Sequence, residues 1–152
     1  PATNVWSAGQ QLPITLQSAA VAVYNGDIFV AGGRIGAGDT GRATDEVWVL
    51  RSGAAEWTKA PPLLGARTAG TAVVVGSRMA VVGGASGGSS TSSLELLDLS
   101  QPAKWIRADF TLSTPRTGHV AAGVGGRVYV IGGTTQPTMA GITGLVEEVT
   151  IR

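Results

Sequence analysis

IFVAGG at residues 28–33, MAVVGG at residues 79–84 and VYVIGG at residues 128–133 are three versions of one stretch, a short apolar strand that ends in two glycines. The second glycine falls at positions 33, 84 and 133, so the steps are 51 residues (33 to 84) and 49 residues (84 to 133). A sequence that repeats with a period of about 50 residues is typical of a solenoid or a propeller, in which each repeat is one supersecondary unit.

The residues before each glycine pair predict a β-hairpin. Apolar strands at 19–24, 70–75 and 119–124 are followed by the dipeptides Asn-Gly, Gly-Ser and Gly-Gly at 25–26, 76–77 and 125–126. These dipeptides suit the two-residue turns of types I′ and II′, which need positive φ at one or both central positions. Each unit therefore contains a predicted hairpin whose second strand ends at the glycine pair.

The residues after each glycine pair predict two further strands. Loops of small residues at 34–45, 85–93 and 134–146 lead to strands that we align on Glu46, Glu95 and Glu148, and a short fourth strand opens at Trp57 and at Trp105. No segment has a helical period. We expect an all-β chain of three four-stranded units in one domain, at roughly 14–60, 64–108 and 115–152.

Composition excludes several classes of protein. Hydrophobic residues make up 43% of the chain, which is enough for a packed core, and the net charge of +1 gives no electrostatic basis for binding nucleic acid or an anionic membrane. No apolar run approaches the roughly 20 residues of a membrane span. With no cysteine, the chain has no thiolate metal site or disulfide. We expect no metal, no cofactor, no nucleic acid and no membrane partner.

The order of these residues resembles the kelch repeat, a family of β-propellers. The third unit shows it best: PRTGHVAAGVGGRVYVIGG at 115–133 has an arginine after a proline, an apolar strand, a turn, and an aromatic residue before the glycine pair. The second unit has Ala80 at the aromatic position, and the first has Leu16 at the arginine position. The resemblance covers almost the whole chain and implies a kelch-type β-propeller with three four-stranded blades.

Several recurring residues are expected to be structural. The glycines allow positive φ and close approach of a neighbouring blade, the tryptophans pack between strands, and each buried arginine needs an anionic partner, for which the resemblance implies the recurring glutamates. These residues are Gly32, Gly33, Gly83, Gly84, Gly132, Gly133, Trp6, Trp57, Trp105, Arg67, Arg116, Glu46, Glu95 and Glu148.

Three blades do not close a ring, because propellers use roughly four to eight. The sequence opens with a segment that resembles an outer strand, residues 4–7 with Trp6, and its last unit has three strands. We therefore expect a homodimer that forms one six-bladed ring, in which the N-terminal strand of each chain closes the last blade of the other. The alternative is that the chain is half of a longer propeller.

The resemblance places a binding site at one mouth of the propeller. The positions it implies are Ser18, Ala69 and Gly118, two residues after the repeat arginine, and Arg34, Ala85 and Thr134, directly after the glycine pair. Of these we take Ser18, Arg34 and Thr134 as candidate binding residues, together with Arg42 on the loop after Arg34.

We expect no catalytic residues, because His119 is the only histidine and takes a structural place in the kelch pattern, and because adjacent carboxylates on a strand point to opposite faces. The leading interpretation is a non-catalytic binding scaffold for a protein or peptide. The alternative is a carbohydrate-active or carbohydrate-binding propeller resembling kelch-type sugar epimerases, with an acidic or hydroxylated small molecule as its ligand.

Overall fold

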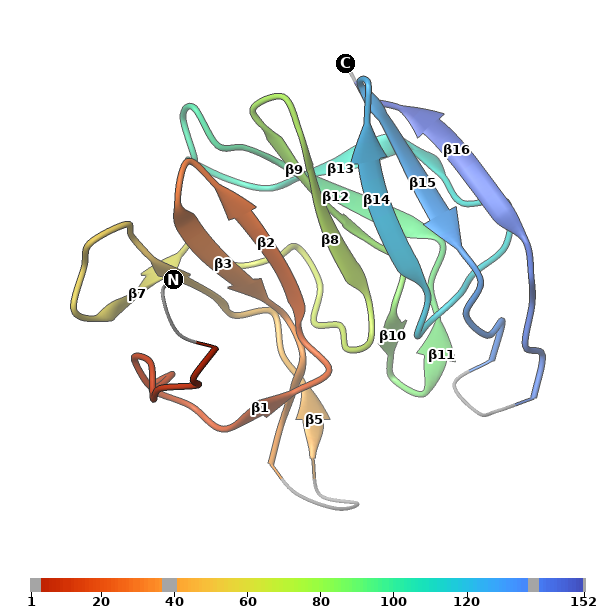
Figure 1. Ribbon diagram of the computed structural model, residues 1–152. Helices are drawn as coiled ribbons and strands as arrows, with labels where there is room; N and C mark the ends of the chain where they lie inside the picture. The colour runs from red at the N-terminus through yellow and green to blue at the C-terminus, as the bar shows by residue number, and fades with distance from the viewer. Residues whose placement is uncertain (1–3, 37–40, 137–139, 152) are drawn as a thin grey trace.

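The computed structural model describes residues 4–36, 41–136 and 140–151, and every regular element in these ranges is a β-strand paired in an antiparallel sheet (Figure 1). The predicted all-β class is thus confirmed. The described part of the chain holds no helix long and apolar enough to cross a membrane.

The first sheet has the order β2-β3-β6-β7, with β2 at Ala20–Tyr24, β3 at Asp27–Ala31, β6 at Val47–Leu50 and β7 at Trp57–Ala60. Its hairpin turns at Asn25 and Gly26, whose φ angles of 50° and 84° are both positive, as a type I′ turn requires. The predicted hairpin is confirmed in this unit, and in this register Tyr24 stands opposite Asp27.

The second and third sheets repeat this arrangement. The second has the order β13-β12-β9-β8, with β8 at Thr71–Val75, β9 at Arg78–Val82, β12 at Ser93–Asp98 and β13 at Ile106–Thr111. The third has the order β14-β15-β16, with β14 at Val120–Val124, β15 at Arg127–Ile131 and β16 at Val146–Thr150. In the described part of the chain, the outer edge of β16 carries no fourth strand.

Five short strands form two small sheets, four of them in the loops after the glycine pairs and one, β1, before the first hairpin. They are β1 at Leu16–Gln17, β4 at Arg34–Ile35 and β5 at Arg42–Ala43, which form one small sheet, and β10 at Ala85–Ser86 with β11 at Ser89–Ser90, which form another. All six glycines of the pairs have positive φ. The pairs therefore turn the chain out of the second strand and into these loops.

The three large sheets stack face to face like a fan, with β2, β8 and β14 side by side on the inside (Figure 1). One buried cluster joins the first and second sheets, and another joins the second and third. The first cluster includes Ala22, Phe29 and Val49 against Ala72, Met79 and Val81, and the second includes Val73, Val82 and Leu94 against Val128, Val130 and Ile151. The middle sheet is therefore covered on both faces, and each outer sheet on one.

The strand register corrects our alignment of the third strands. Val30, Val81 and Val130 stand opposite Trp48, Glu95 and Glu147, so these last three are the equivalent residues. Our alignment on Glu46 and Glu148 was therefore wrong by two residues in the first unit and by one in the third. A shift of one residue moves a side chain to the other face of the sheet.

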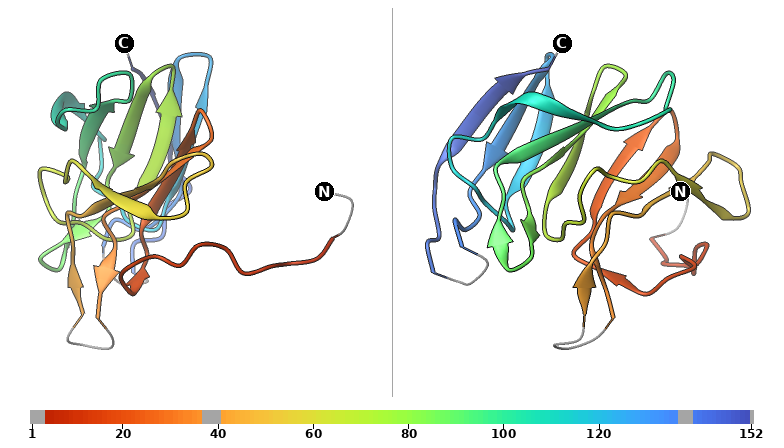
Figure 2. Two further views of the ribbon diagram at one scale, coloured as in Figure 1. Left: turned by 90° about the vertical axis from the view of Figure 1, so that its left-hand side faces the viewer. Right: turned by 180° about the vertical axis from the view of Figure 1, so that it is seen from behind.

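Residues 4–7 form no strand within this chain. Seen in Figure 2 (left), the N-terminal segment leaves the sheets and runs away from them. The side chain of Trp6 is 99% exposed. The expected pairing of this segment involves a second chain, so it stays a prediction.

Candidate functional site

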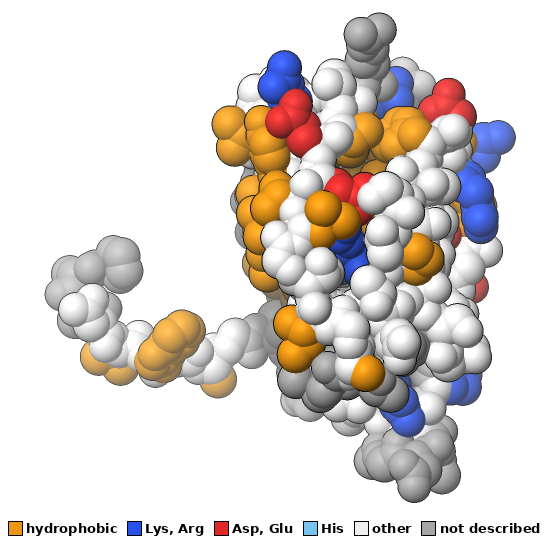
Figure 3. Space-filling view, turned by 90° about the vertical axis from the view of Figure 1, so that its right-hand side faces the viewer, with side chains coloured by type: hydrophobic (Ala, Val, Ile, Leu, Met, Phe, Trp, Pro, Cys, Tyr) orange, Lys and Arg blue, Asp and Glu red, His pale blue; other side chains and the backbone are white. Residues whose placement is uncertain are grey.

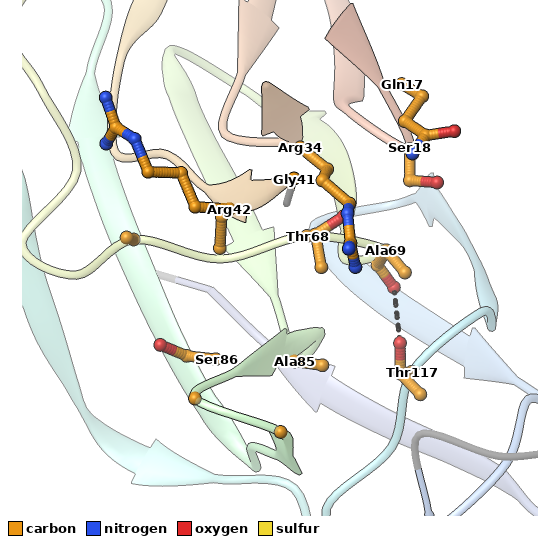
Figure 4. A pocket seen from close by; sticks show the side chains of 14 residues that line it. Gln17, Ser18, Arg34, Gly41, Arg42, Thr68, Ala69, Ala85, Ser86 and Thr117 are labelled. Atoms are coloured by element: carbon orange, nitrogen blue, oxygen red, sulfur yellow. Dashed lines mark hydrogen bonds between the residues drawn. The ribbon is translucent and has the colours of Figure 1, made fainter. Parts of the chain in front are cut away.

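A hollow of about 590 Å³ lies among the loops at one end of the fan (Figure 4). It brings together Ser18, Arg34 and Arg42, three of the four residues that we proposed for binding. Its described lining residues are Gln17, Ser18, Arg34, Gly41, Arg42, Ala43, Ala66, Thr68, Ala69, Ala85, Ser86, Gly87, Gly88 and Thr117. Loops of the first and second units form most of the wall, and Thr117 comes from the third.

Three left-handed residues set the backbone along the inner side of the hollow. Ser18, Ala69 and Gly118 occupy the same place in the three units and have φ angles of 54°, 53° and 64°. The amide of Ala69 donates to the carbonyl of Ser18 at 2.8 Å, and the amide of Gly118 donates to the carbonyl of Ala69 at 2.9 Å. Positive φ costs a non-glycine residue of order 1 kcal/mol, and these hydrogen bonds hold the strained residues in place.

Arginine supplies the charge of the hollow. Figure 4 shows the half-buried side chain of Arg34 running toward Thr68 and Ala69, whereas that of Arg42 points away from Arg34. The hydroxyl of Thr117 donates to the carbonyl of Ala69 at 3.2 Å. No carboxylate and no histidine occur among the lining residues that the structure describes. The hollow therefore presents positive charge and hydroxyl groups, which suit an anionic or hydroxylated ligand.

The fourth proposed residue, Thr134, lies outside the lining. It bridges to Thr117 through the backbone, and its hydroxyl donates to the carbonyl of Ala140 in its own loop at 2.5 Å. The sequence pattern missed Thr68 and Thr117, which do line the hollow. Each follows a repeat arginine directly, and that position was the available signal.

The repeat arginines are buried away from the hollow and hold loops to strands. Arg67 pairs with Glu95 and donates to the carbonyls of Gly83 at 3.1 Å and Ser93 at 3.3 Å. Burial lowers the pKa of Arg67, and the neighbouring Glu95 opposes this shift. A buried arginine with four polar contacts serves the packing of its unit.

Arg116 repeats this arrangement, but its partner is Glu147 instead of the expected Glu148. Burial alone would raise the pKa of Glu147, but hydrogen bonds from Ser113 and the charge of Arg116 outweigh burial and lower it. Glu148, on the other face of β16, pairs with the exposed Arg127 at 2.9 Å.

Glu46 has no arginine partner of this kind, and its partners are Lys59 at 3.1 Å and the indole N–H of Trp48 at 3.0 Å. The hydrogen bond from Lys59 is the main reason that the pKa of Glu46 is lowered. Since Leu16 stands at the arginine position of the first unit, no guanidinium is present there to bind a glutamate.

Tryptophan and histidine also serve packing. Trp105 is buried, and its indole N–H donates to the carbonyl of Pro61 at 2.8 Å, while that of Trp57 donates to the carbonyl of Gln10 at 3.1 Å. His119 is buried outside the hollow, and burial lowers its pKa, with a further contribution from the charge of Arg116. In the described residues, no three His, Cys, Asp or Glu side chains gather as a metal site would require.

Comparison with known proteins agrees with this geometry. A family model described as Kelch motif matches residues 17–64, which cover the first sheet and the loops of the hollow that belong to it. Kelch-like protein 23 of Homo sapiens is 36% identical over 107 residues, and the Mus musculus protein of the same name is 35% identical over 107 residues. These matches cover 70% of this chain and 19% of each relative, so the chain spans about a fifth of their length. With its repeated strands, glycine pairs and buried arginines, the chain belongs to the kelch-repeat family.

Proposed function

We propose that this chain is a protein-interaction scaffold and that its hollow binds an acidic segment of a partner protein. The kelch repeats and the Kelch-like relatives support the scaffold role. One observation supports the choice of ligand: Arg34, Arg42 and the hydroxyl of Ser18 share one hollow whose described lining has no carboxylate. A guanidinium binds a carboxylate through charge-assisted hydrogen bonds, which are roughly twice as strong as neutral ones.

We further propose that each of the three large sheets is one blade and that a second copy of the chain completes a six-bladed ring. The hollow would then occur twice around one mouth of the channel. This part of the proposal concerns the framework, whereas the acidic ligand depends on Arg34 and its neighbours.

Peptide binding tests the ligand. Fluorescence polarisation with labelled peptides rich in Asp and Glu, and with the matching Asn and Gln peptides, is expected to show binding of the acidic set that weakens as salt is raised. Arg34→Ala is expected to raise the Kd about tenfold or more, because a hydrogen bond to a charged group contributes about 1.5–3 kcal/mol. Arg107→Ala removes an exposed arginine of β13 outside the hollow and should leave the Kd unchanged.

Equal binding of acidic and neutral peptides would contradict the proposal, as would equal effects of the two arginine substitutions. The second candidate is a carbohydrate ligand, which the hydroxyl groups of Ser18, Thr68 and Ser86 favour. A free acidic sugar that binds in an Arg34-dependent way, with no binding of any peptide, would support this candidate instead.

A further inference from the structure

The two outer faces of the fan expose apolar side chains, and the face of the third sheet also carries the exposed ion pair of Arg127 and Glu148. On the first sheet, Val21 and Val23 of β2 are 54% and 59% exposed, and on the third sheet Val120 and Val124 of β14 are 61% and 64% exposed. Figure 3 looks onto the side of the third sheet, where hydrophobic side chains gather in the upper and middle part of the surface. Paired apolar faces of this kind mark interaction surfaces.

The inner junctions show what each face packs against. In the first sheet, Ala20 and Ala22 point toward the second sheet, and Val120 and Ala122 take the same places on the third sheet, where they point outward. By the same register, Val21 and Val23 on the exposed face of the first sheet correspond to Ala72 and Val74. These two residues of the second sheet point toward the first sheet. The two free faces are therefore the two sides of one junction that the chain already forms twice.

One backbone hydrogen bond occurs in both inner junctions, but the third unit has only the donor of this bond. The second glycine of a unit donates to the carbonyl at the arginine position of the next unit, Gly33 to Arg67 at 2.8 Å and Gly84 to Arg116 at 2.9 Å. The equivalent amide of Gly133 has no backbone acceptor among the described residues. In the first unit the arginine position is held by Leu16.

The series of backbone hydrogen bonds through Ser18, Ala69 and Gly118 leaves a donor at its first residue and an acceptor at its last. Each amide donates to the carbonyl of the unit before it, so the series begins with the amide of Ser18 and ends with the carbonyl of Gly118. Neither group has a backbone partner within the described ranges. A donor at one end of the fan thus matches an acceptor at the other.

The tryptophans repeat a third contact. Trp105 donates to Pro61, which is four residues after Trp57, and Trp57 donates to Gln10, which is four residues after Trp6. Gln10 therefore stands where Pro61 stands one unit later. This places Trp6, although exposed here, in register with the tryptophans of the two outer strands.

We propose that a second copy of this chain binds head to tail across these faces, with the third sheet of each copy on the first sheet of the other. At each joint, the amide of Gly133 donates to the carbonyl of Leu16 of the second copy, and the amide of Ser18 of the second copy donates to the carbonyl of Gly118. Residues 4–7 of the second copy lie along the open edge of β16. The inference rests on the ring proposed above but is independent of the acidic ligand.

The inner junctions also identify side chains that meet at the joint. In the junction of the second and third sheets, a Cβ added to Gly123 would lie 3.0 Å from Cγ2 of Val75. Val124 occupies the place of Val75, and Val23 occupies that of Gly123. Val124 of one copy is therefore expected to touch Val23 of the other.

Size-exclusion chromatography with light scattering tests the joint. The wild-type chain at micromolar concentration is expected at twice its mass of 15.3 kDa. Val23→Lys and Val124→Asp should each shift the protein to the mass of one chain, and the double variant should return to twice that mass because the new charges face each other. Leu64 is an apolar residue on the connection from β7 to β8 and is 53% exposed. The control variant Leu64→Lys should therefore remain a dimer.

Circular dichroism of each variant establishes that it is folded. Should one single variant fail to fold, the wild-type mass and the other single variant, which lies on a different strand, still decide the outcome. A folded wild-type chain at the mass of one copy would overturn the proposal, and so would single variants that remain dimers. Arg34 lies outside both faces, so failed peptide binding with an intact dimer would refute only the ligand.

Discussion

At the scale of single residues, the second and third units each hold a group of three polar partners that the first unit replaces as a whole. The amide of Leu64 donates to Glu95 at 2.6 Å, and that carboxylate also binds Arg67. The third unit repeats the group with Ser113, Glu147 and Arg116.

At the equivalent places the first unit has Pro13, Trp48 and Leu16. Proline has no amide hydrogen to donate, so the absence of a glutamate in the first unit leaves no backbone donor of this group without an acceptor. The same site thus exists in a charged form and in an apolar form within one chain.

Removal of the arginine alone should therefore be costly. We expect Arg67→Leu to lower the free energy of unfolding by about 3–5 kcal/mol, because Glu95 is left buried and unpaired. The double variant Arg67→Leu/Glu95→Leu should recover part of this loss. Urea unfolding measures both, with Lys59→Ala as the control, since its exposed pair with Glu46 contributes at most about 1 kcal/mol. Equal losses for Arg67→Leu and Lys59→Ala would contradict the buried role.

Sequence alone predicted that the arginines need anionic partners but misplaced two of the glutamates. The connections between the glycine pairs and the third strands run over residues 34–46, 85–92 and 134–145, so they differ in length. The position of the glycine pair therefore does not fix where the third strand begins. The doublet Glu147 and Glu148 then offers one carboxylate to each face of β16. Only the strand register decides which of the two meets Arg116.

At the scale of elements, the hairpins were predictable because their turn chemistry is local. Asn25 and Gly26 need nothing beyond their own backbone preferences to form a type I′ turn. The hollow was partly predictable, since Ser18 and Arg34 follow fixed landmarks of the repeat. Thr134 was not, because the conformation of its own loop turns its hydroxyl away.

The glycines of the strand ends and of the hairpin turns should differ in their sensitivity to substitution. Gly84 has φ of 97°, and an added Cβ would lie 2.7 Å from the carbonyl oxygen of Thr68, whereas Gly126 has φ of 81° with nothing within 4 Å. Gly126→Ala should cost only the left-handed conformation, about 1–2 kcal/mol. Gly84→Ala should cost clearly more, because the clash adds to the same conformational penalty. Thermal or urea unfolding of the two variants compares them, and equal losses would show that close approach plays no part.

At the scale of the whole molecule, each unit is built to be covered on both faces. The middle sheet is covered on both faces, and its residues Met79, Val81 and Val82 are fully buried. The outer sheets have one neighbour each within the chain. The period of the sequence predicted this stack, but no pattern in a single chain identifies what covers its two outer faces, since the answer lies in a contact between molecules.

If two copies complete each other, stability must depend on concentration. The midpoint of urea unfolding should rise with protein concentration, because mass action adds about 1.4 kcal/mol to the stability of a dimer for each tenfold increase. Val124→Asp, which is expected to separate the copies, should unfold at a lower midpoint that is the same at every concentration. Leu64→Lys should keep the wild-type dependence, since it leaves both outer faces intact. A wild-type midpoint that does not move with concentration would mean that Val21, Val23, Val120 and Val124 are stable in water without a second copy, and the head-to-tail joint would then lose its energetic basis.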